Sequence, residues 1–204
     1  ASANISDRGV ATIPLLLDWG KDDEIIMVTN EDFQKQSNKI FGYAYMDDKM
    51  KGLRDLFIGT KILYTYRLNS GGSKAENDYA TAVCSGVRGN DLKIVIRENV
   101  DEAGAWDVIT CLGTERVDVQ TVTAASQLVA NDFVMFKDDF TLTASAGTAL
   151  SGGTNGTATN AAYQTYLDKI ESYRFNTMGV VTTDDSVKAL FTAFNKRMRD
   201  ELGI

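Results

Sequence analysis

The sequence predicts a protein of the mixed α+β and α/β class, in which a layered α/β domain is interrupted by an antiparallel β domain. Strand-like and helix-like periodicities alternate in residues 10–68 and again in residues 160–202, which is the pattern of an α/β layer. Between them lie four strand-like segments, and two of these alternate apolar and polar residues with period two, which is typical of antiparallel strands. We therefore expect residues 1–72 and 149–204 to share one sheet, and residues 73–148 to form an inserted sandwich- or barrel-like domain.

Three strands are expected in the first part of the chain, at residues 10–19, 24–28 and 61–68, because each is apolar and rich in β-branched or aromatic side chains. Pro14 lies inside the first strand. It predicts an edge position or a bend, since proline has no N–H to donate to a neighbouring strand.

Two helices are expected between the second and third strands. Thr29 or Asn30 caps the first helix, because a short polar side chain accepts the unpaired N–H groups of a helix start. Asp47 or Asp48 begins the second helix, and Gly59 ends it. The apolar stripe of this second helix is Met50, Leu53, Leu56 and Phe57.

The middle of the chain begins after a flexible Gly/Ser joint at residues 69–73. Leu92, Ile94 and Ile96 alternate with more polar neighbours, so one face of this strand is expected to be exposed to solvent. Small residues at 144–157 are expected to return the chain as a loop. Four strands, a short helix and a last strand are expected, in that order, at residues 79–84, 92–100, 106–112, 116–123, 124–129 and 133–136.

The last quarter predicts helix, strand and helix. The first helix begins near Asn160, residues 177–182 form a short buried strand, and Asp184 or Asp185 caps the second helix. Both helices have apolar stripes of helical period, which need a sheet completed from elsewhere in the chain. These stripes are Tyr163, Tyr166, Leu167 and Ile170, and Val187, Leu190, Phe191, Phe194 and Met198.

Composition excludes several classes of function. The chain has 204 residues and a net charge of −7, so non-specific binding to nucleic acid or to an anionic membrane is disfavoured. No apolar run approaches the roughly 20 residues that span a bilayer. The chain has no histidine, which removes the usual general base and the Ser-His-Asp and Cys-His arrangements. We therefore assign no catalytic, cofactor-binding or metal-binding residue and expect no enzyme.

The glycine-rich segment at residues 151–157 has two interpretations. It precedes a helix, so its backbone N–H groups are candidates for holding a phosphate. It lacks the Gly-Lys-Ser/Thr ending of a Walker loop and the spacing of a dinucleotide fingerprint. A structural turn is therefore the favoured interpretation.

Other candidate groups also have local explanations. Four carboxylate pairs occur at turns or helix starts, where aspartate is favoured as a cap: Asp22/Asp23, Asp47/Asp48, Asp138/Asp139 and Asp184/Asp185. Two basic groups are either solvated helix faces or docking sites for an acidic partner: Lys49, Lys51 and Arg54, and Lys196, Arg197 and Arg199. Cys84 and Cys111 fit buried thiols or a disulfide, and match no metal spacing.

Short motifs in a fixed order carry a resemblance along the whole chain. They are Ser6-Asp7-Arg8-Gly9, Pro14, Trp19-Gly20, Asn30, Asp32-Phe33, Phe41-Gly42, Leu53, Leu56-Phe57, Gly59, Tyr64, Arg67, Thr81-Ala82, Ser85 to Leu92, and Leu150 to Gly156. The sequence resembles the tail sheath proteins of contractile bacteriophages, defective prophages and phage-tail-like bacteriocins. Asn155 stands where that family commonly has aspartate.

The resemblance implies a structural subunit that polymerises helically around a tail tube and contracts to drive the tube through the bacterial envelope. It implies three partners: other sheath subunits, the tail tube protein and the baseplate. It implies no cofactor, no nucleic acid and no membrane insertion. The protein would be part of a virion or tail-like particle assembled in the host cytoplasm.

The ends of the chain lead us to expect a fragment. The sequence does not begin with Met, and it stops at Ile204 after a helix, where an α/β unit would continue with a strand. By the resemblance, an N-terminal arm and a C-terminal domain are missing, and the arms would exchange strands with neighbouring subunits. The resemblance also places the inserted β domain outward and the α/β part nearer the tube.

Two other functions stay open at this point. One is an α/β phosphate- or nucleotide-binding domain that uses the loop at residues 151–157. The other is a surface adhesin or pilus module, which the β insertion favours and the missing secretion signal disfavours. The resemblance leaves open whether the parent particle is a phage, a defective prophage or a bacteriocin.

Overall fold

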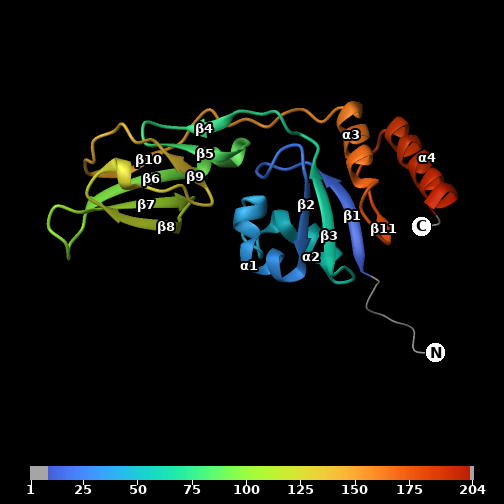
Figure 1. Cartoon of the computed structure of the whole chain (residues 1–204), viewed down its shortest axis with the longest axis horizontal. Coiled ribbons are helices and arrows are strands. Elements are labelled where there is room, and N and C mark those ends of the chain that lie inside the picture. The colour runs from blue at the N-terminus through green and yellow to red at the C-terminus, as the bar shows by residue number, and fades with distance from the viewer. Residues whose placement is uncertain (1–8, 203–204) are drawn as a thin grey trace. The chain divides into compact units, whose positions relative to one another are not determined.

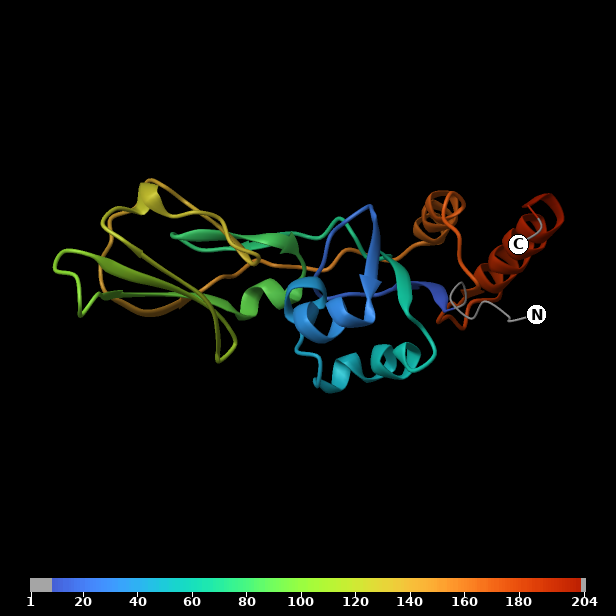
Figure 2. The same cartoon turned by 60° about the horizontal axis from the view of Figure 1, so that its bottom comes forward.

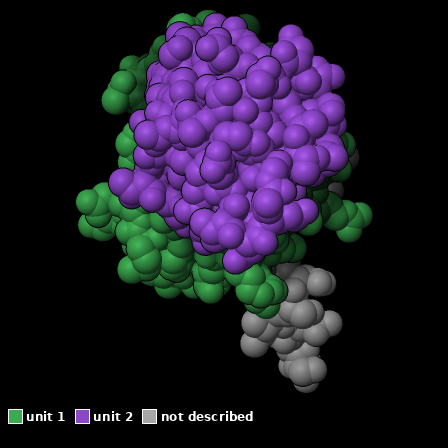
Figure 3. Space-filling view, turned by 90° about the vertical axis from the view of Figure 1, so that its left-hand side faces the viewer, with its two compact units in different colours: residues 1–17, 21–70, 157–204 green, residues 18–20, 71–156 purple. Residues whose placement is uncertain are grey.

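The chain folds into two compact units, which Figure 3 colours separately. The computed structural model describes residues 9–202. Of these, unit 1 contains residues 9–17, 21–70 and 157–202, and unit 2 contains residues 18–20 and 71–156. The chain was expected to return to the first domain at residue 149, and it changes units at Thr157. The three residues 18–20, which belong to unit 2, were not expected there.

Unit 1 is built on a mixed four-stranded sheet (Figure 1). Its strands are β1 (Val10–Leu15), β2 (Ile25–Thr29), β3 (Ile62–Arg67) and β11 (Thr177–Met178), in the order β11-β1-β3-β2. β1 runs parallel to both β11 and β3, whereas β2 pairs antiparallel with β3. Strands from both ends of the chain therefore share one sheet.

Pro14 determines where β11 stops. β1 is an inner strand, so the expectation that Pro14 marks an edge strand is wrong for the sheet as a whole. The carbonyls of Val10 and Thr12 accept from the N–H groups of Asn176 and Gly179, at 2.8 and 2.9 Å. The backbone groups of every second residue of β1 point towards β11, so those of Pro14 point there too. Pro14 has no N–H group with which to continue the hydrogen bonds between β1 and β11.

The predicted buried strand at residues 177–182 is therefore confirmed only at Thr177–Met178, and it is wrong in its length and in its burial. β11 has only two residues, of which Thr177 is exposed and Met178 half-buried. Val181 is 78% exposed. The β-branched sequence indicated a strand, but the ladder ends at Pro14.

Two helices pack on one face of this sheet. α1 (Asn30–Phe41) begins with a capping box, in which the Thr29 hydroxyl accepts from Asp32 N and the Asp32 carboxylate accepts from Thr29 N. α2 (Lys51–Phe57) follows a 3₁₀ turn, η2 (Asp48–Met50), which Asp47 caps. The buried apolar core between these helices and the sheet consists of Ala11, Leu17, Val28, Phe33, Phe41, Met50, Leu53, Phe57 and Leu63.

α3 (Asn160–Ile170) and α4 (Asp185–Leu202) pack on the other face, as Figure 2 shows. The Tyr166 hydroxyl lies 2.7 Å from Thr12 Oγ1, and this contact joins α3 to β1. Burial raises the pKa of Tyr166, because the phenolate would lose its hydration. The buried residues of this second core are Tyr66, Leu68, Tyr166, Leu167, Ile170, Phe175, Val187, Phe191, Phe194 and Met198.

Unit 2 is a β-sandwich. One sheet has the order β10-β6-β7-β8 and the other the order β4-β5-β9, and neither closes into a barrel. The strands are β4 (Lys74–Glu76), β5 (Ala80–Ser85), β6 (Leu92–Glu98), β7 (Trp106–Leu112), β8 (Glu115–Val122), β9 (Val134–Phe136) and β10 (Ser145–Ala149), with short 3₁₀ helices η3 (Val87–Asp91) and η4 (Ala125–Gln127). The predicted fold class is confirmed, with a sandwich as the form of the β part.

β4 and β10 were not predicted. Both are short, and both pair through an irregular register, so neither shows the alternation that marks a strand in a sequence. β10 contains Gly147 at φ +136°, a backbone conformation that favours glycine. A run of small residues therefore forms a strand where a loop was expected.

The core between the two sheets of unit 2 includes Leu92, Ile94 and Ile96, the alternating residues predicted to face inward. It also includes Trp19, which lies far from the other core residues in sequence and is only 1% exposed. Trp19 belongs to residues 18–20, which we call the Trp19 segment. Unit 2 therefore takes one of its largest core side chains from the loop between β1 and β2.

Candidate functional site

The glycine-rich loop is bound to its own unit through its backbone. Ser151 and Glu76 exchange two backbone hydrogen bonds, of 2.8 and 2.9 Å. Gly153 N donates to Asn90 Oδ1 at 2.8 Å, and Thr154 N donates to Ser73 O at 3.1 Å. A phosphate cradle needs N–H groups that point at the ligand, and here three of them already donate to protein oxygens. The geometry agrees with a structural turn and does not support a phosphate site.

Two glycines allow this loop to lie close against its neighbours. A Cβ on Gly153 would lie 2.5 Å from the carbonyl oxygen of Gly86. A Cβ on Gly72 would lie 1.9 Å from the carbonyl oxygen of Thr154. Backbone atoms cannot retreat as a flexible side chain can, so any larger residue at either position displaces the loop.

The loop holds the Trp19 segment. The amide of Asn155 donates to Asp18 Oδ1 at 2.9 Å and accepts from Val87 N at 3.1 Å. The backbone N–H of Arg88 donates to Asp18 O at 3.1 Å. The Trp19 ring lies 6.2 Å from the Phe133 ring, centroid to centroid. The loop is thus the turn that the sequence favoured, and through Asn155 it also contacts a distant segment of the same unit.

Sequence reasoning placed Trp19 at the end of the first strand and Asp22/Asp23 in a turn, and it missed this role. The available signal was the tryptophan itself, because a large apolar side chain in a turn must be buried somewhere. Period-two and period-3.6 patterns do not detect a single anchoring residue.

The Asp22/Asp23 pair also does more than form a turn. Asp22 Oδ1 accepts from Arg67 at 3.1 Å, and the Arg67 side chain is 0% exposed. Asp23 Oδ1 accepts from the hydroxyls of Tyr66 and Ser70, each at 3.2 Å. Burial, and next the neighbouring charge of Asp23, raises the pKa of Tyr66 to about 12. The pair therefore binds the β1–β2 loop to the end of β3.

Two other carboxylate pairs act as helix caps. Asp47 Oδ1 accepts from Lys49 N at 2.9 Å, and Asp184 Oδ1 accepts from Ser186 N at 2.7 Å. The hydrogen bonds from Ser186 lower the pKa of Asp184. Asp138 and Asp139 lie in the turn after β9. Each pair serves a different part of the chain.

The basic groups do not converge on one site. Arg54 donates to the carbonyls of Tyr45 and Asp47, and Lys49 donates to the Tyr43 hydroxyl. Arg197 forms a two-bond ion pair with Glu171, at 2.7 and 2.8 Å, which connects α4 to the end of α3. Arg199 lies 3.6 Å from Asp200. Lys51 and Lys196 are exposed.

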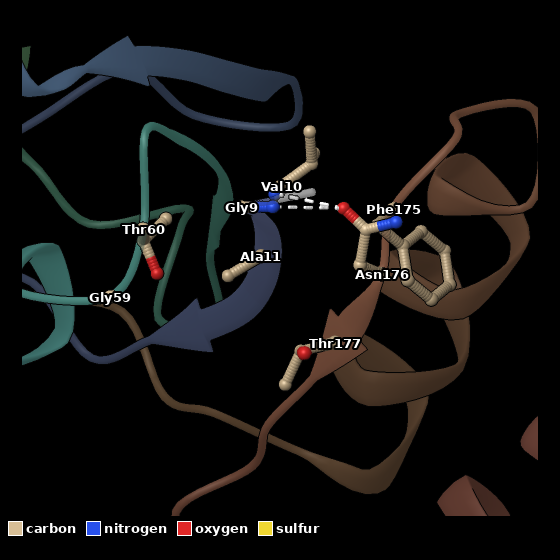
Figure 4. Close-up of a pocket in the computed structure, with 8 residues that line it drawn as sticks. All are labelled: Gly9, Val10, Ala11, Gly59, Thr60, Phe175, Asn176 and Thr177. Atoms are coloured by element: carbon tan, nitrogen blue, oxygen red, sulfur yellow. Dashed lines mark hydrogen bonds between the residues drawn. The ribbon is translucent and has the colours of Figure 1, made fainter. Parts of the chain in front are cut away.

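A pocket of about 550 Å³ lies at the start of β1 in unit 1 (Figure 4). It is lined by residues 9–11, 59–60 and 175–177, and none of these eight side chains is ionisable. The Asn176 amide oxygen accepts from the N–H groups of Gly9 and Val10, each at 3.1 Å. This lining offers no acid, base or nucleophilic thiol.

Within residues 9–202, no group of three or more acidic or cysteine side chains is placed to hold a metal ion. No helix in this range is both long and apolar enough to cross a membrane. Cys84 is half-buried, Cys111 is buried, and both are free thiols, so the alternative of a disulfide is not what the structure shows.

Family profiles match most of the chain. The profile described as tail sheath protein Gp18 domain III N-terminal region matches residues 8–68. The profile described as phage tail sheath protein beta-sandwich domain matches residues 69–160. Two Bacillus subtilis (strain 168) proteins are each 34% identical: the phage-like element PBSX protein XkdK over 98% of this chain, and the uncharacterized protein YqbK over 97%.

Solved structures agree. A sheath tail protein from Desulfitobacterium hafniense is 37% identical over 100% of this chain, with a TM-score of 0.87. A sheath tail protein from Listeria innocua is 33% identical over 97%, with a TM-score of 0.81. The chain spans 47% of each Bacillus relative, and 49% and 46% of these two structures. The profiles and the solved structures name the same kind of protein, and the chain therefore belongs to the family of phage tail sheath proteins.

Proposed function

We propose that the chain is part of a structural subunit that polymerises helically around a tail tube and contracts to drive the tube through the bacterial envelope. The observation that carries this proposal is the likeness to the Desulfitobacterium sheath tail protein, which extends over the whole chain with a TM-score of 0.87. The proposal assigns no catalytic residue and no cofactor.

The organisation of the described residues supports a mechanical role. The candidate loop, the Asp22/Asp23 pair and the arginines all make contacts within their own unit. Contraction of a helical polymer needs subunits that move as rigid bodies between two packings. The hydrogen bonds and ion pairs within each unit make it rigid. Rigidity is needed because a subunit that deformed internally would not pass the movement of contraction on to its neighbours.

The proposed partners follow from the proposed function. They are other sheath subunits, the tail tube protein and the baseplate, within a virion or tail-like particle assembled in the host cytoplasm. We further propose that units 1 and 2 act as separate domains of the subunit, with the β-sandwich of unit 2 facing outward.

Electron microscopy of the protein in its full-length form tests the proposal. We expect hollow cylinders or sheath-like tubes, either spontaneously or when purified tail tubes are added. Protein that stays monomeric under both conditions and binds nucleotides in calorimetry would overturn it. A variant of the loop, Asn155→Ala, provides a control for the calorimetry, because a true nucleotide site there would lose affinity.

A further inference from the structure

We propose that the Trp19 segment couples the folding of the two units, so that neither unit opens without the other. This inference does not rest on the proposed function. It starts from a mismatch between sequence and structure. The strands that flank the segment, β1 and β2, belong to the sheet of unit 1, whereas Trp19 belongs to the core of unit 2.

The segment is held within unit 2 by three different contacts. The Trp19 ring is buried in the core beside Phe133. The Asp18 carbonyl accepts from Arg88 N, and its carboxylate accepts from Asn155. Gly20 follows at φ +130°, a conformation that side chains with a Cβ rarely adopt. Backbone, side chain and ring are therefore all fixed.

The chain on either side of the segment is fixed within unit 1. Leu17 exchanges two hydrogen bonds with the Asn69 side chain, each of 2.9 Å. Asp22 binds Arg67. Only residues 18–21 separate these two attachments, so the chain has little slack. If β1 and β2 unfold, the contacts of Trp19 in unit 2 are strained. If Trp19 leaves its core, the contacts of Leu17 with Asn69 and of Asp22 with Arg67 are strained in turn.

The protein carries a separate spectroscopic signal for each unit. Its two tryptophans, Trp19 and Trp106, both lie in unit 2, so tryptophan fluorescence reports on unit 2. All four α-helices of the described residues lie in unit 1, so helical circular dichroism reports on unit 1. In urea, the unaltered chain is expected to lose both signals in one coincident transition.

The test variant is Trp19→Ala, in which Trp106 still reports on unit 2. We expect the fluorescence midpoint to fall by about 1 M urea or more, the size of a large core truncation. The helical signal is expected to persist to higher urea, so the two transitions separate. Coincident transitions in this variant would overturn the proposal, as would separate transitions in the unaltered chain.

The matched control is Leu142→Ala, which also removes core volume from unit 2 but leaves the Trp19 segment intact. Both signals are expected to shift together to lower urea, because the coupling is retained. If the control separates the two transitions as Trp19→Ala does, any loss of stability in unit 2 is enough to separate them. The Trp19 segment would then have no special role in the coupling.

A second measurement protects the test against a Trp19→Ala variant that fails to fold. Native-state hydrogen exchange of the unaltered chain gives the opening free energy of the slowest amides in each unit. Coupling predicts equal values for β3 and β7, and unequal values would contradict it. The milder variant Asn155→Ala should lower the opening free energy of the β7 amides more than that of the β3 amides.

Discussion

The side chain of Asn69 bonds both backbone polar groups of Leu17: its oxygen accepts from Leu17 N, and its amide nitrogen donates to Leu17 O, each at 2.9 Å. Leu17 is the last residue of unit 1 before the Trp19 segment, and Asn69 is 6% exposed just after β3. One amide therefore imitates a strand partner at the point where the ladder between β1 and β3 has ended.

Asn69→Ala should lower the free energy of unfolding by about 1–3 kcal/mol, because it leaves two buried backbone groups of Leu17 without these partners. Urea denaturation measures the change. Asn160→Ala is the control, since its amide donates to Ser186 Oγ in an exposed position, and its cost should stay within about 0.5 kcal/mol. Equal losses of unfolding free energy in the two variants would show that water takes over the hydrogen bonds that Asn69 makes to Leu17.

Asp22→Ala should destabilise the protein because it removes the carboxylate beside the fully buried Arg67. Breaking a wholly buried pair costs about 3–5 kcal/mol. Asp22 is 31% exposed, so a loss of about 1–3 kcal/mol is expected in thermal or urea unfolding, with water offsetting part of the cost. Lys188→Ala, which breaks an exposed pair with Asp185, should cost less than about 1 kcal/mol. The idea fails if the two variants unfold alike.

Gly72→Ala and Gly52→Ala should change stability in opposite directions. The new Cβ at position 72 meets the Thr154 carbonyl oxygen at 1.9 Å, which should cost about 1–3 kcal/mol or more through displacement of the loop. Position 52 lies in α2 with nothing within 4 Å, so alanine there should add about 0.5–1 kcal/mol through better helix propensity. The melting temperatures of the two variants measure these changes. An unchanged melting temperature for Gly72→Ala would show that the loop is not packed tightly against residue 72.

Stability should fall at alkaline pH through Tyr66. Its pKa is raised to about 12 in the folded protein from 10.0, so the folded state holds the phenol proton more tightly than the unfolded chain does. This contribution is complete below pH 10 and is lost as the pH rises from 10 to about 12. Urea unfolding measured across this window should show a steep loss of stability.

Tyr66→Phe should make the decline over that window shallower, because phenylalanine has no proton to lose. Tyr166 contributes a decline of the same sign, so some slope should persist in this variant. An unchanged slope in Tyr66→Phe would show that Asp23 and burial do not act on this hydroxyl.

The sequence was informative wherever a pattern repeats. Both apolar faces of the α/β part were predicted from helical stripes, and Thr29, one of the two predicted caps, is the N-cap of α1. Leu92, Ile94 and Ile96 identified the inner face of β6. These features depend on residues close in sequence, where spacing alone carries the information.

Features that depend on distant partners could not be predicted in this way. Thr177–Met178 stops short as a strand because of Pro14, more than 160 residues away. The loop at residues 151–157 is the turn that the sequence favoured, but the bond from its Asn155 to Asp18 was not predicted. In both cases the local sequence allows two outcomes, and a contact made only in three dimensions selects one.

The placement of unit 2 within the chain also sets an order of events on the ribosome. Residues 18–20 and 71–156 have all been synthesised once Gly156 is added, whereas the sheet of unit 1 still lacks β11 and two covering helices. Since nascent chains grow from the N-terminus, all of unit 2 leaves the ribosome while one face of β1 and β3 is still uncovered. Tyr66 on that face packs in one core with Tyr166 and Phe191, so this apolar face has no cover from its own chain until α3 and α4 emerge.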